Sequence, residues 1–207
     1  MMKRTLVRID FQNDFVAPDG LLSINNPELI SRHQRFADNL QRGMFDEILD
    51  FRDTHFAETY LRTKEAQSFP IHTQYGTKGW EAASNWKDNI PVQVLFKSTT
   101  NLWNEVNQYA VLQQDWKDRE VYICGVLSDI CVQQGMEGFL KRGAKVSVLE
   151  DLCQGLNKQI PEIINEPKYQ TLVEKGRLRC MTSQQFFRLI LLEKKLQHNL
   201  LSGRGSY

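Results

Sequence analysis

The stretch of residues 121–143, VYICGVLSDICVQQGMEGFLKRG, predicts a buried strand that enters a helix through a sharp turn. Residues 121–124 are apolar and partly β-branched, and a glycine follows them. From about Asp129 the apolar residues fall at helical spacing, and Gly143 stands where a left-handed C-terminal cap is expected. Cys131 therefore lies at the junction, where free backbone N–H groups and the helix dipole favour a thiolate and could hold an oxyanion. Taken alone, such a cysteine is more often a small buried apolar residue.

Other apolar runs alternate with helical patterns, which predicts an α/β fold with a mainly parallel sheet of about six strands. The segment at about residues 53–91 has no clean periodicity, and a long irregular segment in a compact domain is often functional. The expected strands are residues 6–9, 45–52, 92–96, 121–124, 146–149 and 178–181, and the expected helices are residues 27–41, 104–116, about 129–142 and about 183–199.

The composition predicts one ordinary domain over residues 1–207. A net charge of +1 gives no electrostatic argument for a nucleic acid or an anionic membrane as partner. The 4 cysteines have no CxxC spacing, and the sequence begins with no apolar signal segment, so we expect a cytoplasmic protein without disulfides. No apolar stretch approaches the roughly 18 residues that a membrane span requires.

Three of the predicted strands end in chemically active side chains. Asp10 follows the first strand, Lys97 follows the third, and Cys131 lies in the turn after the fourth. In an open parallel sheet these ends lie along one edge, so the three side chains could converge. Asp10 could then take the thiol proton, and Lys97 could hold the carboxylate and favour the thiolate. Taken singly, each has a simpler explanation, Asp10 as a turn or capping carboxylate and Lys97 as a surface lysine.

A second set of side chains could bind a metal ion. Asp53 and His55 are two residues apart, so in an extended chain they point the same way. His72 could supply a third ligand and leave positions open for water or substrate. An ordinary hydrogen-bonded pair is the simpler explanation of an Asp-x-His pattern alone.

Taken together, these segments resemble the isochorismatase-like cysteine hydrolases over about residues 5–155. The resemblance rests on Asp10-Phe-Gln-Asn-Asp-Phe15, Lys97 and Gly125-Val-Leu-Ser-Asp-Ile-Cys131-Val132. Asp53-Thr-His55, Phe69-Pro-Ile-His72 and Gly76-Thr-Lys-Gly79 are similar to the metal-binding branch of that family, the nicotinamidases.

The resemblance implies a three-layer α/β/α fold with helices on both faces of the sheet and a catalytic triad of Asp10, Lys97 and Cys131. It further implies a cis peptide between Val126 and Leu127, and an oxyanion hole made by the N–H groups of Leu127 and Cys131. The implied ligands of a divalent ion (zinc, with iron or manganese in other members) are Asp53, His55 and His72, and the aromatic positions that sandwich a pyridine ring are Phe15 and Phe69.

The expected function is therefore the cysteine-dependent hydrolysis of nicotinamide to nicotinate and ammonia, and a homo-oligomer is common in the family. Several departures leave the exact amide open: Thr54 stands where Trp is usual, Phe69 where Trp is common, and Leu127 where a small residue is usual. The alternatives are hydrolysis of another heteroaromatic carboxamide or an N-carbamoyl compound, and a catalytically silent binding protein on the same scaffold.

Overall fold

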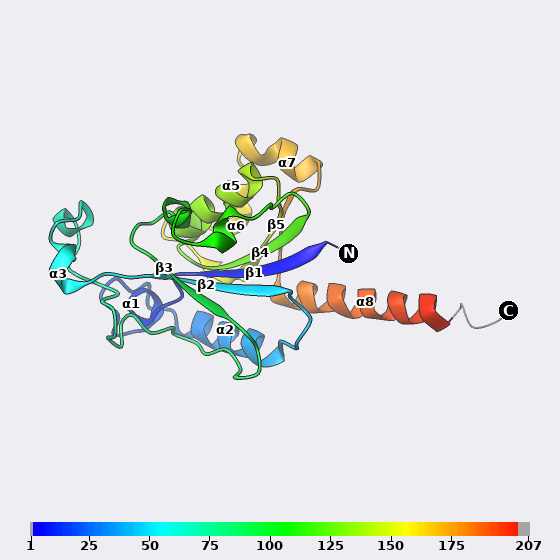
Figure 1. Cartoon of the computed structure of the whole chain (residues 1–207), viewed down its shortest axis with the longest axis horizontal. Helices are drawn as coiled ribbons and strands as arrows, with labels where there is room; N and C mark the ends of the chain where they lie inside the picture. Colours follow the sequence, from blue (N-terminus) through cyan, green and yellow to red (C-terminus); the bar gives the residue numbers. More distant parts are fainter. Residues whose placement is uncertain (1, 203–207) are drawn as a thin grey trace.

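Six parallel strands form a single sheet in the order β3-β2-β1-β4-β5-β6. The computed structural model describes residues 2–202 (Figure 1). The two central strands, β1 and β4, carry apolar side chains on both faces because helices cover both sides of the sheet. The strands are β1 Lys3–Ile9, β2 Glu47–Asp53, β3 Gln93–Lys97, β4 Arg119–Val126, β5 Lys145–Gln154 and β6 Leu178–Met181.

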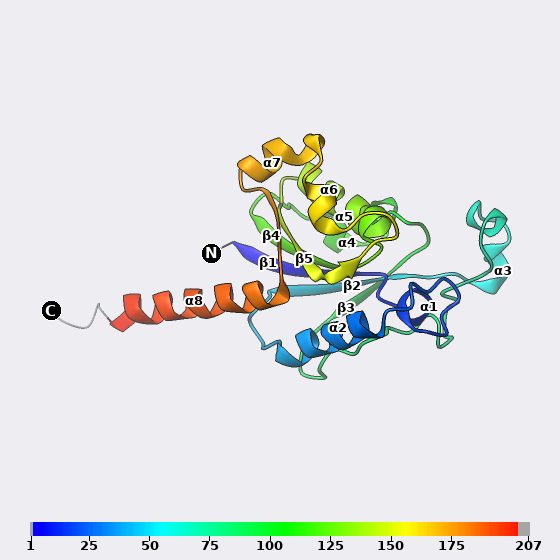
Figure 2. The ribbon, with the colours of Figure 1, turned by 180° about the vertical axis from the view of Figure 1, so that it is seen from behind.

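The helices form two layers, one on each face of the sheet, which confirms the three-layer α/β/α prediction (Figures 1 and 2). Helices α2 and α8 lie on one side, and α5, α6 and α7 lie on the other. The longer helices are α2 Pro27–Asn39, α5 Gln133–Lys141 and α8 Ser183–Ser202, and the short ones are α1 Asn13–Val16, α3 Ala57–Tyr60, α4 Ala110–Gln113, α6 Ile160–Ile164 and α7 Gln170–Glu174. Single 3-10 turns occupy η1 Glu65–Gln67, η2 Leu102–Glu105 and η4 Pro167–Tyr169, and a π-helical turn occupies η3 Ser128–Val132.

Helix α2 begins where the sequence predicts, because Pro27 fits the first helical turn and the Asn26 side chain accepts a hydrogen bond from the Leu29 amide at 2.9 Å. Its buried face, which includes His33 and Phe36, packs toward β5. The expected left-handed cap at the end of the helix that follows Cys131 is also present, since Gly143 has a φ of 96°.

The strand order places a topological switch between β1 and β4, where chain connections leave in opposite directions. In open parallel sheets ligands bind at such a point, beyond the carboxyl ends of the strands. Ile9 pairs with Gly125 across these two strands, and Asp53 pairs with Lys97 across β2 and β3. The ends that carry the predicted active residues are therefore level with one another.

The prediction of one helix over residues 104–116 is wrong. The chain forms η2, an extended break at Tyr109, and then the single turn α4. Side chains of this segment form hydrogen bonds to the backbone of β3 and of the residue after it, and these bonds replace a continuous helix. The Tyr109 hydroxyl accepts from the Phe96 amide and donates to the Phe96 carbonyl, both at 2.9 Å, and Glu105 accepts from the Ser98 amide at 3.1 Å.

Helix α8 starts at Ser183 as expected and continues to Ser202, three residues beyond the predicted end. Phe186 and Ile190 are buried against the sheet. Two residues expected on the apolar side, Leu191 and Leu196, are instead 57% and 62% exposed, because the helix projects past the body of the domain (Figure 2). Within residues 2–202, no helix has the combined length and hydropathy that crossing a membrane demands.

Candidate active site

The turn that carries Cys131 is built from a glycine, a cis peptide and a π-helical turn. Gly125 has a φ of 123°, and a Cβ there would lie 2.0 Å from the Ile9 carbonyl oxygen, so only glycine fits beside β1. The peptide between Val126 and Leu127 is cis, as the family resemblance implies. The amides of Ile130 and Val132 both donate to the Leu127 carbonyl at 3.1 Å, which closes the turn around the cysteine.

Asp10, Lys97 and Cys131 meet in one buried group, as predicted from the strand ends. The Lys97 ammonium lies 2.7 Å from Asp10 Oδ2, and the Cys131 thiol lies near enough to the Asp10 carboxylate for its charge to raise the pKa of the thiol. The other Asp10 oxygen, Oδ1, accepts from the Asp53 amide at 3.0 Å. Lys97 also donates to the Thr99 carbonyl at 2.9 Å, so both polar side chains are fixed in position.

Burial sets the protonation of this group. It raises the pKa of Asp10 above its usual range, an effect that the Lys97 ammonium opposes and the Asp53 charge reinforces. It also raises the pKa of the Cys131 thiol well above its ordinary value, with Lys97 acting in the opposite direction. Burial by itself would lower the pKa of Lys97, but the nearby Asp10 charge raises it, so Lys97 stays a cation. Burial therefore works against the thiolate that the strand-to-helix junction favours, and Lys97 works for it.

Asp53, His55 and His72 form the compact cluster that the sequence predicts. All three are buried, and their ligand atoms lie within 4.8 Å of one another. Asp53 Oδ2 is 3.1 Å from His55 Nε2 and 3.3 Å from His72 Nε2. Burial opposes ionisation of Asp53, but Lys97 and the two imidazoles hold the pKa of its carboxyl well below the usual range. The cluster therefore presents a carboxylate and two ring nitrogens to one point.

These residues fit a divalent metal ion. His55 Nε2 is buried without a hydrogen-bond partner, so its polarity is unmatched unless a cation occupies the point that it faces. The Nδ1 atom of His72 lies 3.0 Å from the Pro70 carbonyl oxygen, an acceptor, which leaves the Nε2 lone pair toward the cluster. One carboxylate and two imidazoles are a donor set typical of catalytic zinc, and also suit iron or manganese.

Glu65 adds a further carboxylate to this cluster, and no sequence pattern predicts it. Its oxygens lie 3.4 Å from His55 Nε2 and 3.7 Å from His72 Nε2. It lies in η1, within the segment that has no periodicity, so no pattern relates it to the two histidines. Gln12 and Thr73 were missed as well: Gln12 donates to the Asp53 carbonyl at 2.9 Å, and the Thr73 hydroxyl donates to Asp53 Oδ2 at 2.8 Å.

One cavity, of about 250 Å³, is lined both by Cys131 and by Asp53 and His72 of the candidate metal cluster. Its size suits a ligand smaller than a typical drug molecule. Phe15 and Phe69 line it as expected, and their rings are 5.7 and 6.3 Å from the ring of His72. The full lining is Asp10, Phe15, Leu22, Asp53, Glu65, Phe69, His72, Lys97, Thr100, Leu127, Ile130, Cys131 and Leu156.

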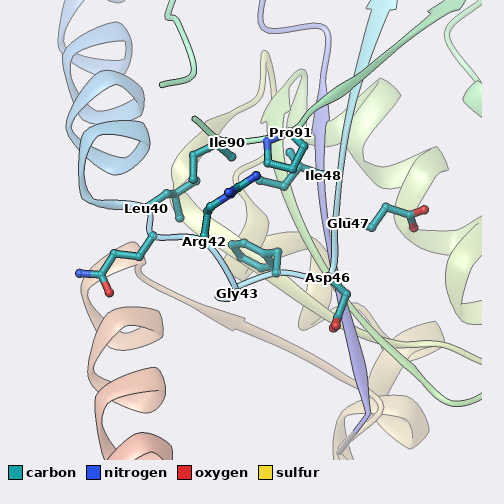
Figure 3. A pocket seen from close by; sticks show the side chains of 10 residues that line it. Leu40, Arg42, Gly43, Asp46, Glu47, Ile48, Ile90 and Pro91 are labelled. Atoms are coloured by element: carbon teal, nitrogen blue, oxygen red, sulfur yellow. The ribbon is translucent and has the colours of Figure 1, made fainter. Parts of the chain in front are cut away.

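A second hollow, near the amino ends of the strands, has none of this chemistry. It is about 110 Å³ and lies between the end of α2 and the start of β2, with Leu40, Ile48 and Ile90 around it and the charged Asp46 and Glu47 at its side (Figure 3). None of its lining residues is a cysteine or a histidine. The cavity at the carboxyl ends of the strands is therefore the candidate substrate site.

A parallel sheet with helices on both faces and a cavity at its topological switch point defines a doubly wound α/β protein. The chain belongs to the isochorismatase family, since the family model of the isochorismatase domain matches residues 4–163. It is a hydrolase of that family.

Three comparisons extend this result. The chain is 26% identical to the nicotinamidase of Saccharomyces cerevisiae, over 80% of this chain and 94% of the yeast protein. A nicotinamidase/pyrazinamidase from Bacillus subtilis superposes with a TM-score of 0.63 at 22% identity, covering 86% of this chain and 99% of that one. The pyrazinamidase of Pyrococcus horikoshii, solved in complex with zinc, gives a TM-score of 0.64 at 21% identity, over 87% and 99% of the two chains. At these identities the two structures establish the fold alone.

Proposed function

We propose that the protein is a cysteine-dependent amidase that hydrolyses nicotinamide to nicotinate and ammonia. The observation that carries this proposal is that one small cavity is lined by the whole Asp10–Lys97–Cys131 group and by two members of the metal cluster, Asp53 and His72. A thiol beside a buried carboxylate supplies a nucleophile and its base. A catalytically silent binding protein would have no need of this buried and costly arrangement of charges.

The reaction begins with Asp10 taking the proton of Cys131. Its raised pKa brings it nearer to that of the thiol than an ordinary aspartate would be, which makes it a better proton acceptor here. The sulfur forms a bond to the amide carbon, and the N–H groups of Leu127 and Cys131 are the proposed donors to the oxyanion. Asp10 then gives its proton to the leaving nitrogen as the C–N bond breaks, which leaves a thioester and ammonia.

The same carboxylate completes the cycle. Asp10 takes a proton from a water molecule, the resulting oxygen nucleophile attacks the thioester carbon, and the Cys131 sulfur leaves and recovers a proton. Lys97 remains charged throughout and balances the negative charge on Asp10 and Asp53. A divalent ion held by Asp53, His55 and His72, with zinc as the first candidate, would supply a Lewis acid that binds the pyridine nitrogen.

The charges around the cavity favour a neutral substrate over an anionic one. Three of the lining residues, Asp10, Asp53 and Glu65, are carboxylates, whereas Lys97 is the single lysine or arginine among them. Lys97 is already engaged with two of those carboxylates. An N-carbamoyl amino acid would bring a carboxylate with no cation to meet it, whereas nicotinamide carries no charge. The electrostatics therefore support the carboxamide.

The test is ammonia release from nicotinamide by the purified, zinc-loaded protein. We expect turnover in the wild type and a loss of at least about 10³-fold in Cys131→Ala, because removal of a nucleophile leaves only binding and oxyanion contributions. Cys180→Ala is the matched control, since Cys180 lies on β6 outside the cavity. No ammonia from nicotinamide, with turnover of an N-carbamoyl compound, would replace nicotinamide by the alternative substrate.

A further inference from the structure

The side chain of Asp129 joins the turn that carries Cys131 (the nucleophile turn, residues 125–132) to the loop between β5 and α6. Asp129 belongs to η3, two residues before Cys131. Its Oδ1 accepts from the Leu156 amide at 3.0 Å, and its Oδ2 accepts from the amides of Asn157 and Lys158 at 2.8 and 3.3 Å. One carboxylate thus receives three consecutive backbone N–H groups from a segment 27 to 29 residues away.

This contact is not a surface ion pair. The nearest basic side chain on the loop, Lys158, directs its ammonium to Glu166 at 2.6 Å. Gly155 also shows how closely the loop is drawn in: a Cβ at that position would lie 2.8 Å from Asp129 Oδ1 and 2.1 Å from the Lys158 carbonyl oxygen. A larger residue would push the loop off the carboxylate, so the glycine is part of the arrangement.

Both ends of the contact reach the substrate cavity. Leu127, Ile130 and Cys131 line it from the nucleophile turn, and Leu156 lines it from the loop. Leu156 is 62% exposed, so core packing does not hold it in place. Its own amide, bonded to Asp129, is the attachment that keeps this leucine at the cavity wall.

We propose that Asp129 is a positioning residue for the reaction at Cys131, because its carboxylate holds the residue 155–158 loop against the nucleophile turn and thereby places Leu156 against the bound substrate. This inference rests on the proposed function for its substrate. Asp129 does not touch the reacting atoms and acts through Leu156. It therefore sets how well the amide is bound more than how fast the bound amide reacts.

The first measurement is amide hydrogen exchange. In the wild type the amides of residues 156–158 should be protected, and Asp129→Asn should increase their exchange rate by about tenfold or more, because asparagine offers one acceptor oxygen in place of the two that share these three hydrogen bonds. Glu166→Gln is the control, since it removes the partner of Lys158 but leaves the three backbone bonds intact. Unprotected amides in the wild type, or equal effects of the two substitutions, would overturn the proposal.

The second measurement is a double-mutant cycle with nicotinamide as substrate. Asp129→Asn and Leu156→Ala should each raise KM by about tenfold and change kcat less. In the Leu156→Ala protein, Asp129→Asn should add less than about a twofold change in KM, because both act through the same leucine. Effects on KM that multiply, or a loss confined to kcat, would refute a role through Leu156.

Two outcomes separate this inference from the proposed function. If the wild type releases no ammonia from nicotinamide but its 156–158 amides are protected, the nicotinamidase proposal fails and the contact remains. If the enzyme is active and these amides exchange freely, the contact fails and the nicotinamidase proposal remains. Should Asp129→Asn not fold, Asp129→Ser offers a smaller acceptor and is expected to show the same loss of protection.

Discussion

Replacing Lys97 by methionine should destabilise the protein far more than breaking an exposed ion pair of equal length. The Lys97 side chain is 1% exposed, and its ammonium lies 2.7 Å from Asp10 Oδ2 and 3.5 Å from Asp53 Oδ1. Lys97→Met keeps most of the side-chain volume but leaves two buried carboxylates without their cation. Removing one partner of a buried pair costs about 3–5 kcal/mol.

This cost corresponds to a fall in melting temperature of about 6–20 °C for a chain of this size. Lys78→Met is the matched control, because the Lys78 ammonium is also 2.7 Å from a carboxylate, that of Asp19, while both side chains are exposed. Solvent screens that pair, and we expect no measurable change in the melting temperature.

The second half of the test adds Asp10→Asn to Lys97→Met. Removing one of the two stranded carboxylates should restore about 2 kcal/mol of the free energy of unfolding, measured by urea denaturation of all four proteins in the cycle. The reasoning is refuted if Lys97→Met and Lys78→Met lower the melting temperature equally. It is also refuted if the Asp10 and Lys97 substitutions are additive.

Three further predictions concern the metal cluster, a buried histidine and a helix glycine. Thr73→Ala should weaken zinc binding about 10–100-fold in a chelator competition, because Asp53 loses the hydroxyl donor that orients it. Thr73→Ser keeps a hydroxyl and should bind zinc as the wild type does. Equal zinc affinities of the two variants would contradict this prediction. Burial, reinforced by Arg8, lowers the pKa of His33 to about 3, so below about pH 6.5 the unfolded chain binds a proton that the folded chain does not. The stability of the wild type relative to His33→Gln should therefore fall by about 1.4 kcal/mol per pH unit from about pH 6 to pH 4 in urea titrations, and a constant difference would disprove it. Gly138→Ala places a Cβ 1.8 Å from Trp103 Nε1 and should lower the free energy of unfolding by about 1–3 kcal/mol despite the better helix propensity of alanine, so an unchanged melting temperature would argue against the clash.

The parts of the site that follow from strand ends could be predicted from the sequence. Asp10 and Lys97 come directly after apolar runs, and Cys131 lies in the turn that follows another, and a parallel sheet brings such ends to one edge whatever the loops between them do. The same argument does not reach Glu65 or Asp129, which make their contacts through irregular segments. The spacing of apolar residues does not predict which loop will contact which strand.

The failed helix over residues 104–116 has a related cause. Its apolar spacing is real, and Leu112 is buried, but the polar groups of Glu105 and Tyr109 find stronger partners on β3 and the residue after it than a helix could provide. Such tertiary hydrogen bonds override local propensity. At Leu191 and Leu196 the pattern of a buried helix face continues where the body of the domain has ended.

The placement of β1 in the middle of the sheet has a consequence for the newly made chain. This strand is synthesised before both of its neighbours, β2 and β4, and β4 follows more than a hundred residues behind it. Pairing over such sequence separations is slow. A nascent polypeptide that stops before Cys131 lacks the proposed nucleophile. Activity that appears during synthesis or refolding therefore reports that β4 has paired with β1 and closed the sheet.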